Sequence, residues 1–389
     1  MRVHLFHHPG AMDLHGTLAD AEVEYEDKTS PAIDVAFQFA DNRALATALG
    51  FTQVYEFAFA VIWTTTPWTL PANQAVAIGG EIDYALIRFS AGLLLLAKDL
   101  VENCMQSYGL DDYQVVAEFK GEKLEGLMLE HPFYDRQVPL VLGDHVTLDA
   151  GTGLVHTAPA HGIEDFDVGQ RYDLAVDNPV GDDGRFFDSV PLVGGKSVWE
   201  ANAIIIDTLK ERQKLLRVVD YEHSYPVCWR HKTPIIFRAT PQWFIGLDRG
   251  ERNLRDIAAA AVDDTAFYPD WGRARLAGMI ANRPDWCVSR QRNWGTPMAL
   301  FVHRESGELH PGTGELLEQV AQRVEKEGIE AWFALPEEEL LGDEASQWKK
   351  VPDTLDVWFE SGTTHMGVLE RRDELTKPAD LYLERSDQH

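Results

Sequence analysis

The chain has 389 residues, of which 45% are apolar, and its 63 acidic and 35 basic residues give a formal net charge of −28. This length accommodates two or three domains with their own cores, and the composition argues against a disordered chain. The acidic balance argues against a nucleic-acid partner, because phosphate binding normally leaves a basic footprint. Three scattered cysteines, Cys104, Cys228 and Cys287, argue against a disulfide framework and fit a reducing compartment.

No targeting or membrane segment is predicted. No apolar stretch approaches the roughly 18 residues of a membrane span. The opening Met1 to Gly16 lacks the apolar block of a secretory signal. We therefore expect a cytoplasmic protein with no membrane partner.

The first half of the chain is predicted to be mixed α and β structure, with apolar and polar residues alternating from Ala32 to Ile87 and short apolar runs from Leu93 to Leu142. The apolar run Phe57 to Trp63 leads into Thr64-Thr65-Thr66-Pro67. Because Pro67 has no N–H for a ladder, the three hydroxyls are expected at a sheet edge or rim. The alternative is a threonine-rich edge strand without a catalytic role.

A second group of polar residues follows a glycine-punctuated strand. Residues Leu154 to Ala158 are predicted to form this strand, after Gly151 and Gly153. A lone histidine is more often structural than functional. Here two imidazoles and two carboxylates lie close together, near glycines that permit close backbone approach to a ligand, which favours a functional site. These side chains are His156, His161, Glu164 and Asp165.

Helical spacing of apolar residues predicts helices at Trp199 to Arg212 and at Leu316 to Glu327. The second helix lies in an acidic block, Glu305 to Glu344, which we expect to be a solvated insertion. Between the two helices, Tyr221 to Arg238 mixes basic and aromatic residues. This mixture suits RNA backbone contact and base stacking, and an ordinary linker with solvated charges is an equal alternative. A new domain is expected from about Trp243.

Several ordered motifs resemble the isoleucyl-tRNA synthetases, a family of class I aminoacyl-tRNA synthetases. Residues Thr64 to Asn73 closely resemble the threonine-rich element of the family's editing domain, and Gly151 to Asp165 resembles the other wall of that pocket. Three later segments also resemble the family: the first two resemble its nucleotide-binding catalytic domain, and the third, the last eight residues, resembles the strand and loop that hold the aminoacyl-adenylate. These later segments are Trp286 to Gly295, Asp353 to Gly362 and Tyr382 to His389.

The resemblance covers about Ala19 to His389 and implies a mixed α/β fold. We expect an atypical segment at 1–18, a β-rich editing domain at 19–225, a connecting ribbon at 226–245 and a partial Rossmann-like catalytic domain at 246–389, with an acidic insertion near 303–350. Asp270 to His389 should form an incomplete parallel-sheet unit. Neither ATP signature of the family, His-x-Gly-His or Lys-Met-Ser-Lys-Ser, occurs in the sequence. We therefore expect a fragment that needs neither the ATP nor the magnesium of the intact family and that does not exchange pyrophosphate with ATP.

The resemblance also implies a substrate and site roles. A hydrophobic pocket discriminates one methylene by only about 1 to 3 kcal/mol, a limit established for this family itself, so valine must be removed from tRNA(Ile) by hydrolysis of its ester. The hydroxyls of Thr64, Thr65 and Thr66 would orient the attacking water and the ester oxygens. The expected partners are tRNA(Ile) and the valine or isoleucine aminoacyl ester, bound by a monomer.

The remaining roles follow from the same resemblance. Asp165, with Glu164 as its local rival, would hold the substrate ammonium group. His156 would limit the size of the pocket so that isoleucine does not fit. Thr69 and Asn73 would shape the adenosine and ester environment. Further residues would be a remnant of the adenylate site: Trp358, Glu384, Asp387 and Gln388.

The sequence departs from the family pattern in places. Glu360 stands where the family usually has Asp, and Arg385 replaces a glycine beside the adenylate. Cys228-x-x-His231 has half of a zinc-knuckle spacing, but one cysteine and one histidine cannot close a tetrahedral site, so no metal is expected.

Two alternatives from other classes stay open. One is a tRNA-binding or regulatory remnant of the synthetase without catalysis, and the other is an unrelated α/β hydrolase whose motifs mimic the family.

Overall fold

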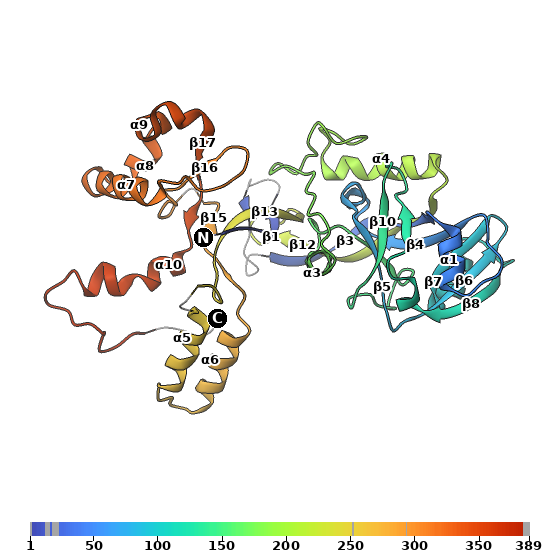
Figure 1. The fold of residues 1–389 in the computed structure, drawn as a ribbon, viewed down its shortest axis with the longest axis horizontal. Coiled ribbons are helices and arrows are strands. Elements are labelled where there is room, and N and C mark those ends of the chain that lie inside the picture. Colours follow the sequence, from blue (N-terminus) through green and yellow to red (C-terminus); the bar gives the residue numbers. More distant parts are fainter. Residues whose placement is uncertain (1, 12–15, 18–22, 251–252, 293, 384–389) are drawn as a thin grey trace. The chain divides into compact units, whose positions relative to one another are not determined.

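The computed structural model describes residues 2–11, 16–17, 23–250, 253–292 and 294–383. The chain divides into two compact units (Figure 1). The N-terminal unit is Phe6–Thr240, and the C-terminal unit is Pro241–His389 together with Met1–Leu5. The boundary after Thr240 lies inside the segment 226–245 that was expected to be a ribbon, and the N-terminal unit begins upstream of the expected start at residue 19.

The N-terminal unit contains a large mixed sheet of ten strands, as expected for a β-rich α/β domain. Strand β12 (Leu215–Cys228) pairs along most of the long strand β3, and two pairs are parallel, β10 with β5 and β4 with β7. In spatial order the other strands are β11 (Leu154–Thr157), β5 (Ala75–Ile78), β10 (Gln137–Leu142), β9 (Met128–Glu130), β3 (Val23–Phe39), β4 (Ala58–Thr64), β7 (Gly92–Ala97), β6 (Asp83–Phe89) and β8 (Gln114–Lys120).

The core of this unit lies between the sheet and the elements that cover it. Phe37, Ile62, Leu86 and Leu95 are fully buried there, which fits the apolar and β-branched composition of their strands. Helix α4 (Val198–Glu211) begins with a capping box formed by Ser197 and Glu200 and buries one apolar face, confirming the predicted helix. The shorter elements are α1 (Asn42–Ala48), η2 (Pro67–Ala72), η3 (Lys98–Leu100), α2 (Val101–Ser107), η4 (Gly121–Leu124) and α3 (Ile163–Arg171), and β1 (Arg2–Ala11) pairs with β2 (Gly16–Thr17).

The C-terminal unit is built from short elements. Helices α5 (Leu254–Asp263) and α6 (Trp271–Ala281) pack together after β13 (Ile235–Ile245), which pairs with β14 (Trp286–Cys287). Strands β15 (Ser289–Arg290) and β18 (Thr354–Leu355) pair antiparallel, as do β16 (Phe301–His303) and β17 (Trp348–Lys350). The unit ends in α10 (Val357–Gly362) and η6 (His365–Leu369).

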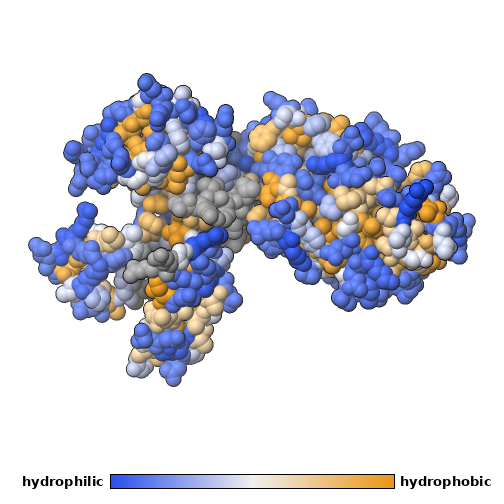
Figure 2. Space-filling model, viewed as in Figure 1, coloured by the Kyte–Doolittle hydropathy of each residue, from blue (hydrophilic) through white to orange (hydrophobic). Residues whose placement is uncertain are grey.

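The pair β16 and β17 brackets the acidic segment. Between them lie α7 (Thr313–Glu327), α8 (Glu330–Ala334), α9 (Glu337–Leu341) and η5 (Gly342–Gln347), so the predicted helix at Leu316 to Glu327 is confirmed. Trp332 and Phe301 pack edge to face in a small core of their own. Hydrophilic side chains cover much of the visible face of this segment (Figure 2).

The expected parallel sheet is not present in the described residues of Asp270 to His389. Every strand pair described there is antiparallel, and each strand is only two or three residues long. Parallel strands need a crossover connection, and none of the connections described in this part of the chain returns a strand parallel to its partner. Among the described residues no helix is both long and apolar enough to cross a bilayer.

Candidate functional site

The threonine-rich element lies where β4 ends. Thr64 is the last residue of β4 and pairs with Ile33 of β3. On its other side, β7 pairs with Ala58 to Ala60, so in the described structure the end of β4 has a hydrogen-bonded strand partner on one side alone. The threonines therefore sit at the rim of the sheet, as expected. The alternative of an edge strand is wrong, because β4 lies between β3 and β7.

The hydroxyls of this element form a continuous chain. Thr64 Oγ1 lies 3.2 Å from Thr66 Oγ1, which lies 3.5 Å from Thr69 Oγ1. Thr64 Oγ1 also accepts from the N–H of Thr66 at 3.1 Å, and Thr69 Oγ1 donates to Thr66 O at 2.8 Å. Thr64 and Thr69 are buried, whereas Thr65 and Thr66 are partly exposed.

A short 3₁₀ turn carries Thr69 toward the facing strand. Pro67 occupies its first position, where a fixed φ and a missing N–H suit the start of a helix. The turn ends at Asn73, whose N–H donates to Leu70 O at 3.0 Å. The Asn73 side chain is fully buried and donates to Ala75 O at 2.7 Å.

His156 joins the two segments that were predicted to face each other. It lies on β11, which the structure forms at the predicted position, and its ring is buried. Its Nε2 is 2.8 Å from Thr69 Oγ1, and its Nδ1 is 3.5 Å from Asn73 Nδ2. Because the Asn73 amide nitrogen can only donate, Nδ1 is the acceptor and Nε2 carries the hydrogen that Thr69 Oγ1 accepts. Burial lowers the pKa of His156 to about 4, so the ring is neutral near pH 7.

Asp165 lies in the first turn of α3 and folds back toward the end of β11. Its Oδ2 accepts from the N–H of Ala158 at 2.9 Å. Burial raises the pKa of Asp165 to about 6, an effect that the Ala158 N–H opposes and the charge of Glu164 reinforces. Glu164 itself is exposed. Of the two carboxylates, Asp165 is therefore the one attached to the β11 wall.

The two glycines before β11 do not serve as expected. Gly151 and Gly153 have φ values of +78° and +80°, where glycine is favoured. A Cβ at Gly151 would lie 2.9 Å from Trp63 Cβ, and one at Gly153 would lie 2.2 Å from Ala97 Cβ. The close approach is thus to β4 and β7 and not to a ligand.

His161, one of the predicted group of polar residues, and three residues that no motif marks also contact this region. His161 packs its ring edge to face against Trp68, with 4.9 Å between the centroids. The side chains of His131, Arg136 and Asn202 bond to the backbone of the 3₁₀ turn. No local pattern marks these three, because each acts across 61 or more residues of sequence.

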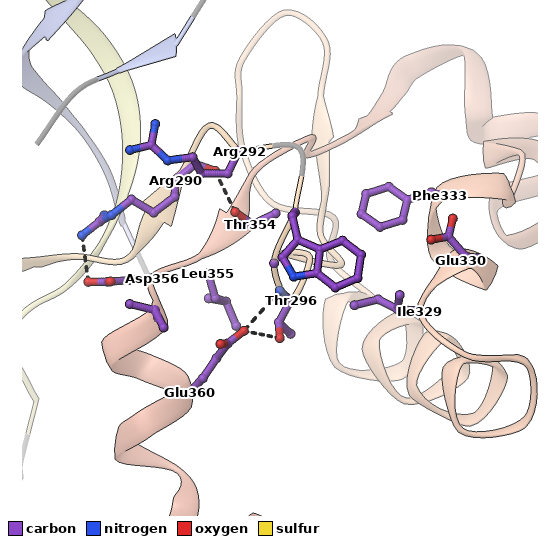
Figure 3. Close-up of a pocket in the computed structure, with 13 residues that line it drawn as sticks. Arg290, Arg292, Thr296, Ile329, Glu330, Phe333, Thr354, Leu355, Asp356 and Glu360 are labelled. Carbon is purple, nitrogen blue, oxygen red and sulfur yellow. Dashed lines mark hydrogen bonds and ion pairs between the residues drawn. The ribbon is translucent and has the colours of Figure 1, made fainter. Parts of the chain in front are cut away.

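The two segments likened to a nucleotide-binding domain lie side by side in the C-terminal unit. Arg290 Nη2 is 2.7 Å from the buried Asp356 Oδ2 (Figure 3). The same Oδ2 accepts from Trp286 Nε1 at 3.0 Å. Glu360, at the position of the family's Asp, accepts from the N–H and hydroxyl of Thr296. These contacts tie Trp286–Gly295 to Asp353–Gly362.

A pocket of about 660 Å³ opens beside these segments. Ile329, Glu330 and Phe333 form its opposite side (Figure 3). Trp358 follows Asp356 and places its N–H 3.3 Å from Asp356 Oδ1. The other predicted adenylate residues, Glu384, Asp387 and Gln388, and the departure at Arg385 lie outside the described residues.

No cluster of three metal-ligating side chains occurs in the part of the chain that the structure describes. Cys228, the residue of the half zinc knuckle, is buried against Ile235 and Val23.

Residues 9–389 match the family described as tRNA synthetases class I (I, L, M and V). The chain is 61% identical over 376 residues to an isoleucine–tRNA ligase of Chromobacterium violaceum, covering 96% of this chain and 40% of the relative. It is 60% identical over 388 residues to that of Thiobacillus denitrificans, covering 97% and 42%. The chain thus spans about two fifths of the length of these relatives. The crystal structure of a P. knowlesi cytosolic leucyl-tRNA synthetase editing domain matches at 10% identity with a TM-score of 0.40, covering 54% of this chain and 99% of that one. The chain belongs to the class I tRNA synthetases of the isoleucine, leucine, methionine and valine group.

Proposed function

We propose that this chain carries the editing site of an isoleucine–tRNA ligase, the enzyme that attaches isoleucine to tRNA(Ile) with ATP. In this proposal the N-terminal unit hydrolyses valine that has been esterified to tRNA(Ile) by mistake. One observation carries the proposal. The His156 ring, at 2.8 Å from Thr69 Oγ1, joins the threonine-rich element to the opposite wall, so that side chains of both segments form one hydrogen-bonded network.

The hydroxyl chain supplies the chemistry of this site. Water adds to the ester carbonyl, the bond from the carbonyl carbon to the ribose oxygen breaks, and a proton from the water ends on that oxygen. The hydroxyls of Thr64, Thr65 and Thr66 orient the water and donate to the oxygen on which negative charge develops. Thr64 and Thr66, whose hydroxyls belong to the chain, suit this role because they need little reorganisation during the reaction, and Thr65 lies between them in sequence.

Asp165 is the proposed partner of the substrate ammonium group. Its raised pKa, about 6, leaves it ionised at neutral pH, and a bound cation offsets the cost of its burial. The Ala158 N–H holds the carboxylate at the end of β11, directly after His156 and Thr157. Glu164 is exposed and has no such anchor in the described structure.

His156 is proposed to limit pocket size and not to act as a base. A general base must accept a proton near neutral pH, whereas the His156 pKa of about 4 keeps the ring neutral and its Nε2 hydrogen is given to Thr69. A buried ring fixed at both nitrogens is a rigid wall. It can exclude isoleucine, which is larger than valine by one methylene.

The C-terminal unit is proposed to belong to the Rossmann-like synthetic domain of the ligase, with Trp358 beside the adenylate. The described lining of its pocket has two arginines, Arg290 and Arg292, and three carboxylates, and Arg290 is already paired with Asp356. This set does not by itself form a phosphate site, so we derive no step through ATP or magnesium. We propose tRNA(Ile) and the valine and isoleucine esters as partners of a cytoplasmic monomer.

Hydrolysis of valyl-tRNA(Ile) by the purified chain tests the proposal. We expect valine release above the uncatalysed rate, little release from isoleucyl-tRNA(Ile), and loss of release in Thr66→Val. Thr47→Val, on the exposed surface of α1, is the matched control and should leave the rate unchanged. Binding of the tRNA without hydrolysis would favour the non-catalytic remnant and overturn the editing assignment.

A further inference from the structure

The backbone of the η2 turn is held by three side chains that are far from it in sequence. Asn202 of α4 accepts from the N–H of Trp68 at 2.9 Å. His131 lies 3.0 Å through Nε2 from Leu70 O, and Arg136 donates from Nη2 to Pro71 O at 2.8 Å. Successive backbone groups of one short turn are thus satisfied by residues from two other parts of the sheet domain.

Asn202 performs the task that an N-cap side chain usually performs. Thr66 is the N-cap residue of η2, and an N-cap threonine normally accepts from the second or third N–H of the helix. Here Thr66 makes no side-chain cap, Asn202 takes the N–H of Trp68, and Thr66 O takes the N–H of Thr69. The Thr66 hydroxyl therefore does not cap the helix and instead bonds to the hydroxyls of Thr64 and Thr69.

His131 and Arg136 hold the other end of the turn. His131 Nδ1 accepts from the N–H groups of Phe133 and Tyr134, at 3.3 and 3.0 Å, so Nε2 carries the hydrogen and donates to Leu70 O. The His131 ring is buried and stacks on Tyr134 with 5.0 Å between the centroids. Arg136 is half-buried beside the same Tyr134 ring. Contacts with neighbouring residues other than η2 therefore also hold the His131 and Arg136 side chains in place.

We propose that Asn202, His131 and Arg136 are positioning residues that clamp the η2 turn, so that the hydroxyls of Thr66 and Thr69 keep the geometry that ester hydrolysis needs. None of the three has to touch the substrate. The clamp explains how a six-residue turn with two prolines, which can form few hydrogen bonds of its own, keeps Thr69 within 2.8 Å of His156. The catalytic part of this inference rests on the proposed function, whereas the clamping part does not.

Substitution of Asn202 in the full chain tests the clamp with two independent readouts. Asn202→Leu removes the acceptor, Asn202→Asp keeps it, and Thr208→Val on the same helix is the matched control. Hydrogen–deuterium exchange of the peptide covering residues 64–74 should be about tenfold faster in Asn202→Leu and near wild type in the other two variants. The kcat for valyl-tRNA(Ile) should fall at least about tenfold in Asn202→Leu with little change in KM, and Asn202→Asp should restore it.

Each outcome bears on a separate claim. Unchanged exchange and unchanged kcat in a folded Asn202→Leu protein would overturn the clamp, and so would a lower melting temperature with kcat intact, which indicates a purely structural role. If Asn202→Leu does not fold, Arg136→Gln and Arg136→Lys replace it, since only lysine keeps a charged donor for Pro71 O. If the wild-type chain does not deacylate at all, the proposed function fails, and the exchange measurement still decides the clamp.

Discussion

Replacement of Asp165 by asparagine separates the charge of this residue from its structural contact. The carboxylate accepts from the N–H of Ala158 at 2.9 Å and so ties the first turn of α3 to the end of β11. An asparagine amide oxygen can accept the same hydrogen bond, but it carries no charge for the substrate ammonium group. Asp165→Ala removes both interactions, so comparing the two variants separates the effect of the charge from the effect of the hydrogen bond to Ala158.

The expected magnitudes have opposite signs for activity and stability. Loss of one partner of a largely desolvated charge pair costs about 2 to 5 kcal/mol, and because Asp165 is partly exposed we expect the lower end, a fall of about 30-fold in kcat/KM. The folded pKa of about 6 lies above the ordinary value of 3.8, so folding favours the protonated form. Stability from this group is present below pH 3.8 and is lost as pH rises through 6, a loss on the order of 3 kcal/mol at pH 7. Asp165→Asn should therefore not lower, and should tend to raise, the free energy of unfolding at pH 7.

Hydrolysis of valyl-tRNA(Ile) and urea denaturation at pH 7 measure the two effects. The wild-type rate should fall as pH drops below about 6, where Asp165 becomes protonated. Glu164→Gln, at the exposed neighbour, is the control and should leave the rate intact. If Asp165→Asn hydrolysed the ester at the wild-type rate, or if Glu164→Gln lost as much activity, the ammonium contact would have to be reassigned.

Three further predictions concern the same unit. His156→Ala should keep most valine hydrolysis and begin to destroy isoleucyl-tRNA(Ile), and loss of valine hydrolysis without entry of isoleucine would contradict the proposed gate. Gly153→Ala places a Cβ 2.2 Å from Ala97 Cβ at a φ of +80°, and it should lower the free energy of unfolding by about 2 to 5 kcal/mol. Gly80→Ala is the control and should change this free energy little, because a Cβ there makes ordinary contacts. Equal urea midpoints for the two variants would refute this prediction. Burial lowers the pKa of His131 to about 3, so folding favours the neutral ring. The contribution of His131 to stability is therefore present above pH 6.5 and is lost as pH falls toward 3. His131→Gln should flatten the dependence of the melting temperature on pH between these two values.

Local sequence signals predicted the elements whose causes are local. The helical spacing of apolar residues predicted α4, and Pro67 predicted that strand pairing stops near it, as it does at Thr64. The resemblance also placed His156 opposite the threonine-rich element, and the structure brings them together. These predictions needed only residue spacing or the pairing of two motifs.

The remaining features depend on contacts between distant parts of the chain. The interior place of β4 follows from its pairing with β7, and the function of Gly153 follows from its approach to Ala97. Neither partner is marked by a pattern near the residue concerned. The clamp by Asn202 is of the same kind, because an asparagine on a helix surface has no feature that tells which backbone N–H it will meet. The prediction of a parallel sheet in the C-terminal unit is wrong for the described residues, where the strand pairs are antiparallel. The reason is related, since resemblance between motifs does not indicate how such short strands pair.

The acidity of the chain does not by itself prevent contact with RNA. In the basic and aromatic segment at 221–238, Arg238 pairs with Asp182 and Lys232 pairs with Glu24. Asp182 is mostly exposed, and Lys232 and Glu24 are each about half exposed. Exposed ion pairs contribute only about 0 to 1 kcal/mol. The pair of Lys232 and Glu24 is of this kind, so a phosphate can replace the Glu24 carboxylate at small cost. The Arg238 side chain is only 15% exposed and is less accessible to such a partner. Trp229 is 42% exposed, with the Arg230 guanidinium over its ring, and offers a surface on which a base can stack. The proposed contact with tRNA therefore depends on the local arrangement of these side chains and not on the net charge of −28 alone.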